Sequence, residues 1–224
     1  MTRPADSTVA SRRPTAADWA GFAGHAGVAA LMVVRAPWVS LFLIPSIVHM
    51  LMAACSFLMR DRARALVRDP LARTVAYLGG FGVFAFVQFA TAFRPDWLAP
   101  TTDPRLQLAS VLCGLVGVFF EIWAIWHLRR AFATEAAARR LVTTGPYQFS
   151  RHPIYTGATV AQLGLLLGYP TLPVALAIAG WVVCTRMRVH FEERALVEAF
   201  PEYGDYRQRV GALVPAPRRL RTAP

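Results

Sequence analysis

Long apolar runs alternate with short polar segments along the first half of the chain. The runs occupy residues 19–34, 39–59, 74–92 and 106–126. A helix needs roughly 20 apolar residues to cross the hydrocarbon core of a bilayer, so each run predicts a membrane helix. The first run is the shortest, and the sequence leaves open whether it crosses the bilayer completely.

Two shorter apolar runs follow, at residues 155–168 and 174–187. The segment 169–173 between them contains two prolines, which interrupt a helix because proline lacks the amide hydrogen and clashes with the preceding turn. The runs therefore predict a helical hairpin. Gly164 and Gly168 are four positions apart, a spacing that favours close helix contact within it.

The pattern changes again after the last apolar run. Apolar residues recur at helical spacing between Phe191 and Phe200 with charged residues around them, which predicts an amphipathic helix from Val189 onward. Pro201 ends it, and a short helix is expected after that. Together these patterns predict an all-α fold, a polytopic membrane helical bundle with about six membrane helices, the last two forming a C-terminal helical hairpin.

Composition agrees with a membrane protein. Of the 224 residues, 55% are hydrophobic and 17% charged, and the mean hydropathy is +0.39, values that exclude a water-soluble globular domain. The three cysteines lie inside apolar runs without the spacing of metal ligands, so we expect no metal site.

The basic residues are distributed as in a membrane protein. The formal net charge is +11, and all 24 basic residues are arginines, nearly all of which lie outside the apolar runs, so we expect a lipid bilayer and no nucleic acid as partner. Counting arginines places the N-terminus, the loop 60–73 and residues 127–155 in the cytoplasm. The absence of lysine is typical of a GC-rich bacterial gene, and we therefore expect a bacterial inner membrane. The first 18 residues predict a cytosolic tail and not a cleaved leader.

Polar and helix-breaking residues gather at 141–157, between two apolar regions, and Arg188 and Glu192 follow about thirty residues later. Irregular backbone and ionisable side chains near a membrane are costly unless they line a cavity enclosed by protein. Arg188 and Glu192 share one helix face. Taken alone they also fit a surface ion pair worth about 0–1 kcal/mol, but their order after the segment 141–157 favours a functional site.

These motifs resemble a known family. The chain contains LVTTGPY from Leu141, RHPIYTG from Arg151, R-x-x-x-E-E-x-x-L from Arg188 and F-x-x-Y-x-x-Y-x-x-x-V from Phe200. In this order they resemble the isoprenylcysteine carboxyl methyltransferase family and its relatives among integral membrane methyltransferases. The resemblance covers residues 139–215, about a third of the chain.

The resemblance implies a pocket for S-adenosylmethionine at the cytoplasmic face and a catalytic role for Arg188, which would face the methyl acceptor. The residues that it implicates in cofactor binding are Leu141, Val142, Tyr147, His152, Pro153, Ile154, Tyr155 and Glu192. The chain departs from the family pattern at Pro201 and Gly211, and also at Arg139 and Arg140, where eukaryotic members carry other residues. These departures lie at the helix end and at the pocket rim. They therefore affect the expected acceptor more than the expected cofactor.

The expected function is methyl transfer from S-adenosylmethionine to a small or lipophilic acceptor with a carboxylate, thiol or amine. A soluble Rossmann-type enzyme is disfavoured because the glycines at 79–82 lie inside an apolar run without a βαβ pattern. Two alternatives stay open. One is an NADPH-dependent membrane reductase of the sterol-reductase type, which shares an Arg-His-Pro-x-Tyr element, and the other is a non-catalytic lipid-binding membrane protein.

We expect four regions: a cytosolic N-terminal tail (1–18), a membrane-helix region (19–126), a catalytic methyltransferase region (127–215) and a C-terminal tail (216–224). Glu121 is interpreted as a helix-end acid paired with His127, Arg129 or Arg130, and a role in the substrate pocket is the alternative. The sequence determines neither the acceptor nor the oligomeric state.

Overall fold

The computed structural model describes residues 13–35, 43–59, 61, 63–82, 99–132 and 137–213. The α-helices in this part of the chain are α1 (Ala16–Arg35), α2 (Leu43–Met59), α3 (Pro70–Tyr77), α5 (Pro104–Leu128), α6 (Pro153–Gly168), α7 (Leu172–Ala199) and α8 (Tyr203–Arg209). Short helical turns are η1 (Leu78–Gly82), η2 (Arg129–Ala131) and η3 (Gly145–Gln148). The predicted all-α class is confirmed, since the two strands have only two residues each.

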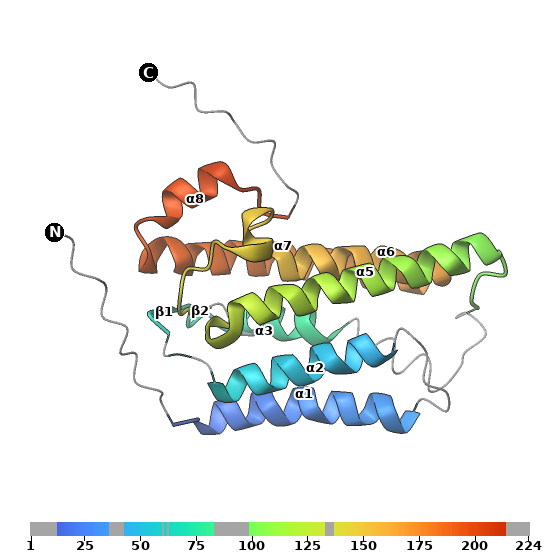
Figure 1. The fold of residues 1–224 in the computed structure, drawn as a ribbon, viewed down its shortest axis with the longest axis horizontal. Helices are drawn as coiled ribbons and strands as arrows, with labels where there is room; N and C mark the ends of the chain where they lie inside the picture. The colour runs from blue at the N-terminus through green and yellow to red at the C-terminus, as the bar shows by residue number, and fades with distance from the viewer. Residues whose placement is uncertain are drawn as a thin grey trace, which may run out of the picture.

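The helices form two layers (Figure 1). In the lower layer of that view α1 and α2 lie side by side, and α5, α6 and α7 run along the upper one. Strand β1 (Ala65–Leu66) pairs antiparallel with β2 (Ala137–Ala138), and this ribbon lies near one end of the bundle. The buried side chains of Phe57 and Ile125 connect α2 with α5, so the two layers share a core.

Helix starts follow local capping chemistry. Asp103 accepts a hydrogen bond from the amide of Arg105 at the start of α5, and Asp69 caps α3 in the same way. At α1, the amide of Thr15 donates to the Asp18 carboxylate at 2.7 Å, one half of a capping box. This cap starts α1 three residues before the apolar run 19–34, within the segment predicted as a tail.

Helix α6 packs chiefly along α5. A Cβ atom on Gly157 would lie 2.6 Å from the carbonyl oxygen of Gly117, and one on Gly164 would lie 2.7 Å from that of Ser110. Glycine is thus required where the two backbones meet. The predicted break at 169–173 does separate α6 from α7, but Gly164 and Gly168 contact α5 and not the second arm of a hairpin, so their predicted partner was wrong.

Helix α7 is continuous over 28 residues. It joins the predicted run 174–187 and the predicted amphipathic helix from Val189 into one element, because the polarity changes there without any residue that breaks the backbone pattern. The buried side chain of Phe191 packs against Ala72 and Val75 of α3. The polar C-terminal half of α7 is therefore packed against α3.

Among the described residues, two helical stretches are long and apolar enough to cross a membrane. They are Pro104–Ala131 and Leu172–Ala199, with mean hydropathy 2.2 and 1.5. The expected number of about six membrane helices is not confirmed. The run 39–59 begins outside the described residues, and the run 74–92 ends outside them. The described part of the run 74–92 consists of the end of α3 and the π-helical turn η1.

Candidate functional site

Several elements meet in one cavity: the C-terminal end of α5, the loop after β2, η3, the start of α6 and the polar half of α7. The lining residues are Leu128, Ala131, Ala137, Arg139, Arg140, Tyr147, Arg151, His152, Ile154, Tyr155, Glu192 and Leu196. The cavity volume is about 100 Å³. A single buried water needs roughly 10–15 Å³, so the space accommodates a ligand larger than water.

A glycine turn directs the chain into this cavity. Gly145 has φ +61°, and a Cβ atom there would collide with the ring of His127 on α5. Both the backbone angle and the contact therefore require glycine. The turn leads into η3, which buries Tyr147, and Pro153 occupies the first turn of α6, where its missing amide hydrogen costs nothing.

Glu192 is the carboxylate that lines the cavity, with 20% of its side chain exposed. The Tyr155 hydroxyl donates a short hydrogen bond to Oε1 of Glu192. The Nη2 atom of Arg188, one helical turn earlier, lies 3.7 Å from the same oxygen, and its guanidinium carbon lies 5.0 Å from the centroid of the Tyr155 ring. Glu192, Tyr155 and Arg188 thus orient one another.

Glu193, the next residue, binds a different set of groups. Arg151 donates from Nε and Nη2 to Oε1 of Glu193 at 2.9 and 2.6 Å. Nε of Arg207 lies 3.4 Å from the other carboxylate oxygen. Arg151 also donates from Nη1 to the backbone carbonyls of Arg207 and Val210. This arrangement ties the end of α8 to α7.

His152 lies between the two carboxylates. Its Nδ1 is 3.4 Å from Oε2 of Glu192, and its Nε2 is 3.5 Å from Oε1 of Glu193. Burial of the ring opposes protonation, but the two carboxylates outweigh it and raise the pKa of His152 above its ordinary value. Since carboxylates only accept hydrogen bonds, an imidazolium matches both neighbours better than either neutral tautomer does.

The segment after α8 holds the loop before α6. The amides of Arg151 and His152 donate to the carbonyls of Gly211 and Ala212 at 2.9 and 3.0 Å, and the Ser150 hydroxyl also donates to Ala212. The Tyr206 hydroxyl donates to the carbonyl of Tyr147 at 2.6 Å. Burial and the nearby carboxylate of Glu192 raise the pKa of Tyr147 above its ordinary value, so this phenol stays neutral.

Five of the residues predicted to bind the cofactor line the cavity: Tyr147, His152, Ile154, Tyr155 and Glu192. Leu141 instead packs against the core around Tyr203, and Pro153 is buried in the first turn of α6. Val142 is half-buried and does not line the cavity. Arg188 is also outside the lining set, although it contacts both Tyr155 and Glu192. The predicted roles of all these residues stay predictions.

Sequence reasoning missed several lining residues. Leu196 lies one turn after Glu192 on the same helix face, a spacing that could have identified it. Arg151 belongs to the Arg-His-Pro motif but received no role, and Arg139 and Arg140 were noted only as departures. Leu128, Ala131 and Ala137 come from segments without a motif, so no sequence signal pointed to them.

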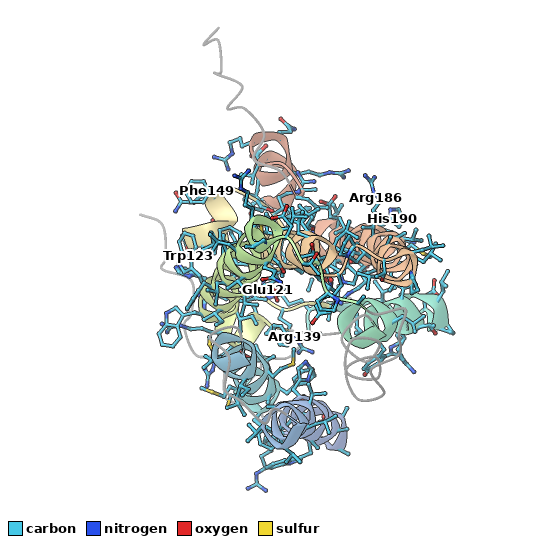
Figure 2. The ribbon with its side chains drawn as sticks, turned by 90° about the vertical axis from the view of Figure 1, so that its right-hand side faces the viewer. Glu121, Trp123, Arg139, Phe149, Arg186 and His190 are labelled. Carbon is cyan, nitrogen blue, oxygen red and sulfur yellow. The ribbon has the colours of Figure 1, made fainter. Side chains whose placement is uncertain are left out.

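Glu121 lies two helical turns before the end of α5 and is buried, with its Cγ atom against Gly157 of α6. Figure 2 shows Glu121 and Arg139 toward the centre of the molecule, whereas Trp123 and Phe149 lie at one outer edge and Arg186 and His190 at the other. Glu121 therefore occupies the α5–α6 interface. The predicted pairing with His127, Arg129 or Arg130 stays untested.

Known proteins share this region. Residues 106–203, which include all of the lining residues of the cavity, match the family described as phospholipid methyltransferase. The chain is 36% identical over 135 residues to the cobalt-zinc-cadmium resistance protein CzcN of Cupriavidus metallidurans, covering 59% of this chain and 60% of that protein. It is 37% identical over 109 residues to protein-S-isoprenylcysteine O-methyltransferase B of Arabidopsis thaliana, covering 45% and 55%. It is 29% identical over 139 residues to methanethiol S-methyltransferase 1 of Bradyrhizobium diazoefficiens, covering 54% and 46%.

These matches confirm the resemblance found in the sequence: residues 106–203 match the phospholipid methyltransferase family model, and two of these relatives are named methyltransferases. Together with the two apolar helices of spanning length, they support an integral membrane protein. The chain spans only about half the length of the curated relatives that it matches.

Proposed function

We propose that this protein is an integral membrane methyltransferase that uses S-adenosylmethionine. The observation that carries the proposal is the cavity itself. Tyr147, His152 and Tyr155 from the segment 141–157 meet Glu192, about forty residues away, inside the region that matches methyltransferases. Residues from distant motifs that converge on one cavity are typical of a binding site.

The donor set fits this cofactor. S-adenosylmethionine supplies a methyl group on a positively charged sulfonium and also carries an ammonium group. Glu192 offers the cavity a carboxylate that is already oriented by Tyr155 and Arg188, and the ring of Tyr147, which also lines the cavity, offers an aromatic face, which attracts cations. These residues would bind and orient the positively charged part of the cofactor.

Catalysis by this site would depend on alignment. Methyl transfer is an in-line displacement in which the positive charge on sulfur is lost, so positioning and exclusion of water supply much of the rate. An acceptor that is already a carboxylate or thiolate needs no general base. Arg188 would orient such an anionic acceptor, because its guanidinium can donate two parallel hydrogen bonds.

Two of these relatives are named for O-methylation of a protein S-isoprenylcysteine and for S-methylation of methanethiol. We therefore propose a small or lipophilic acceptor with a carboxylate or thiol, and an amine as the remaining candidate. The arginine distribution favours a cytoplasmic active site in a bacterial inner membrane, with residues 127–215 as the catalytic region.

Binding of the demethylated product tests the proposal without knowledge of the acceptor. The protein purified in detergent should bind S-adenosylhomocysteine with micromolar affinity, roughly −8 kcal/mol, in a calorimetric titration. Glu198→Gln, an exposed position on the same helix, serves as the matched control for Glu192→Gln. Tight binding of NADPH without any response to S-adenosylhomocysteine would instead establish the reductase alternative.

A further inference from the structure

The charges that line the cavity are unbalanced. One carboxylate, Glu192, faces three arginines, at positions 139, 140 and 151. Arg151 is occupied by Glu193 and by two backbone carbonyls. Glu192 is engaged by Tyr155, Arg188 and His152. Arg140 therefore adds a positive charge to the lining that no described carboxylate balances, and Arg139 is the remaining arginine of the lining.

Their backbone is well fixed. Both arginines directly follow β2, where Ala138 pairs with Ala65 of β1 and its carbonyl accepts a hydrogen bond from the amide of Arg64 at 2.7 Å. Ala138 is 1% exposed. The arginines thus extend from a ribbon that is anchored in the core, and Figure 2 shows Arg139 toward the interior.

The two side chains differ in what they bind. Arg139 donates from Nη1 to the backbone carbonyl of Asp61, which orients its guanidinium. Arg140 is exposed, and no ion pair or hydrogen bond links its side chain to another described residue. Both arginines line the same cavity, and guanidinium groups suit an anion with two oxygens.

We propose that Arg139 and Arg140 form an anion subsite for the α-carboxylate of the methyl donor. This inference rests on the proposed function. The donor's amino-acid end carries an ammonium and a carboxylate, and the cavity presents the two complementary charges on separate elements, Glu192 on α7 and the arginine pair after β2.

A pair of ligands that differ only in this carboxylate tests the subsite. They are S-adenosylhomocysteine and its decarboxylated analogue, S-adenosyl-3-thiopropylamine, each titrated into the full-length protein in detergent. Hydrogen bonds to charged groups are worth about 1.5–3 kcal/mol, so Arg140→Gln should weaken S-adenosylhomocysteine about tenfold or more and leave the analogue within about twofold. Arg139→Gln should show the same selectivity, and Arg194→Gln, which removes an exposed arginine on α7 outside the cavity, should affect neither ligand.

The possible failures are distinguishable. If the unaltered protein binds neither ligand, both the proposed function and the subsite are wrong. If it binds both with equal affinity, or if Arg140→Gln weakens both by the same factor, the function stands and the subsite is wrong. Should Arg139→Gln fail to fold, Arg140→Gln decides the question, because an exposed side chain contributes little to stability.

Discussion

The two sides of His152 differ sharply, although each presents a glutamate from the same turn of α7. On one side Glu192 lines the cavity and is contacted by Tyr155 and Arg188. On the other side Glu193 does not line the cavity, and its oxygens are taken up by Arg151 and Arg207. Adjacent residues of one type thus separate into one that lines the cavity and one held by ion pairs outside it, because successive helix positions point about 100° apart.

The largest effect is expected on the structural side. Glu193→Ala should lower the free energy of unfolding by about 3–5 kcal/mol, since removal of one partner from a nearly buried ion pair leaves Arg151 without its counter-charge. Denaturant titration of the detergent-solubilised protein measures this. Glu198→Ala is the control, and a loss no greater than the control's would mean that Glu193 is merely a surface charge.

On the cavity side, Arg188→Ala should reduce kcat/KM for the acceptor about a hundredfold, the cost of a misplaced reacting group. Affinity for S-adenosylhomocysteine should change little, and Arg188→Lys should recover little activity, because a lysine cannot donate two parallel hydrogen bonds. Steady-state kinetics with a labelled methyl donor provide the measurement. Equal loss of cofactor binding would assign Arg188 to the cofactor site.

Glu192→Ala should weaken S-adenosylhomocysteine about tenfold, the cost of one hydrogen bond to a charged group. Glu193→Ala should weaken it less, since Glu193 does not line the cavity and acts on it only indirectly, through His152 and Arg151. Calorimetric titration of both variants at a temperature where both are folded makes the comparison. If both substitutions weakened the affinity for S-adenosylhomocysteine by a similar small factor, the distinction between Glu192 and Glu193 would be wrong.

The smallest expected effect is a pH dependence that originates at His152. Glu192 and Glu193 raise the pKa of His152 above its ordinary value, so its contribution to stability is complete below the unfolded-state pKa. That contribution is lost as the pH rises through the higher folded-state pKa. Thermal unfolding between pH 5 and 9 should show this loss on the alkaline side, roughly around and above neutrality, and His152→Gln should reduce it. An unchanged profile in His152→Gln would place the titrating group elsewhere.

Much of the site was predictable because motif and helix spacing act locally. The four-residue spacing of Arg188 and Glu192 placed both on one face of a helix, and the structure shows them in contact. The choice of Glu192 over Glu193 followed from the same spacing, and Glu192 is the one that lines the cavity. Their effects on a cofactor stay to be measured.

Other features could not be predicted, because they depend on which elements pack together. Nothing in the local pattern of Gly164 indicates that its partner is α5 and not α7. The involvement of Arg139 and Arg140 depends on the pairing of β2 with β1, about seventy residues earlier in the chain. Two-residue strands carry no periodicity that a sequence pattern could reveal.

The sequence by itself determined the helical class, the break between α6 and α7 and the residue types that could bind a charged ligand, because hydrophobic periodicity and proline geometry depend on near neighbours. The tertiary structure decided the rest: the pairing of α6 with α5, the attachment of the segment after α8 to the loop at Ser150, and the placement of His152 between two carboxylates. These depend on contacts between residues some forty to sixty positions apart. Such contacts form only when whole helices pack, so no local pattern encodes them.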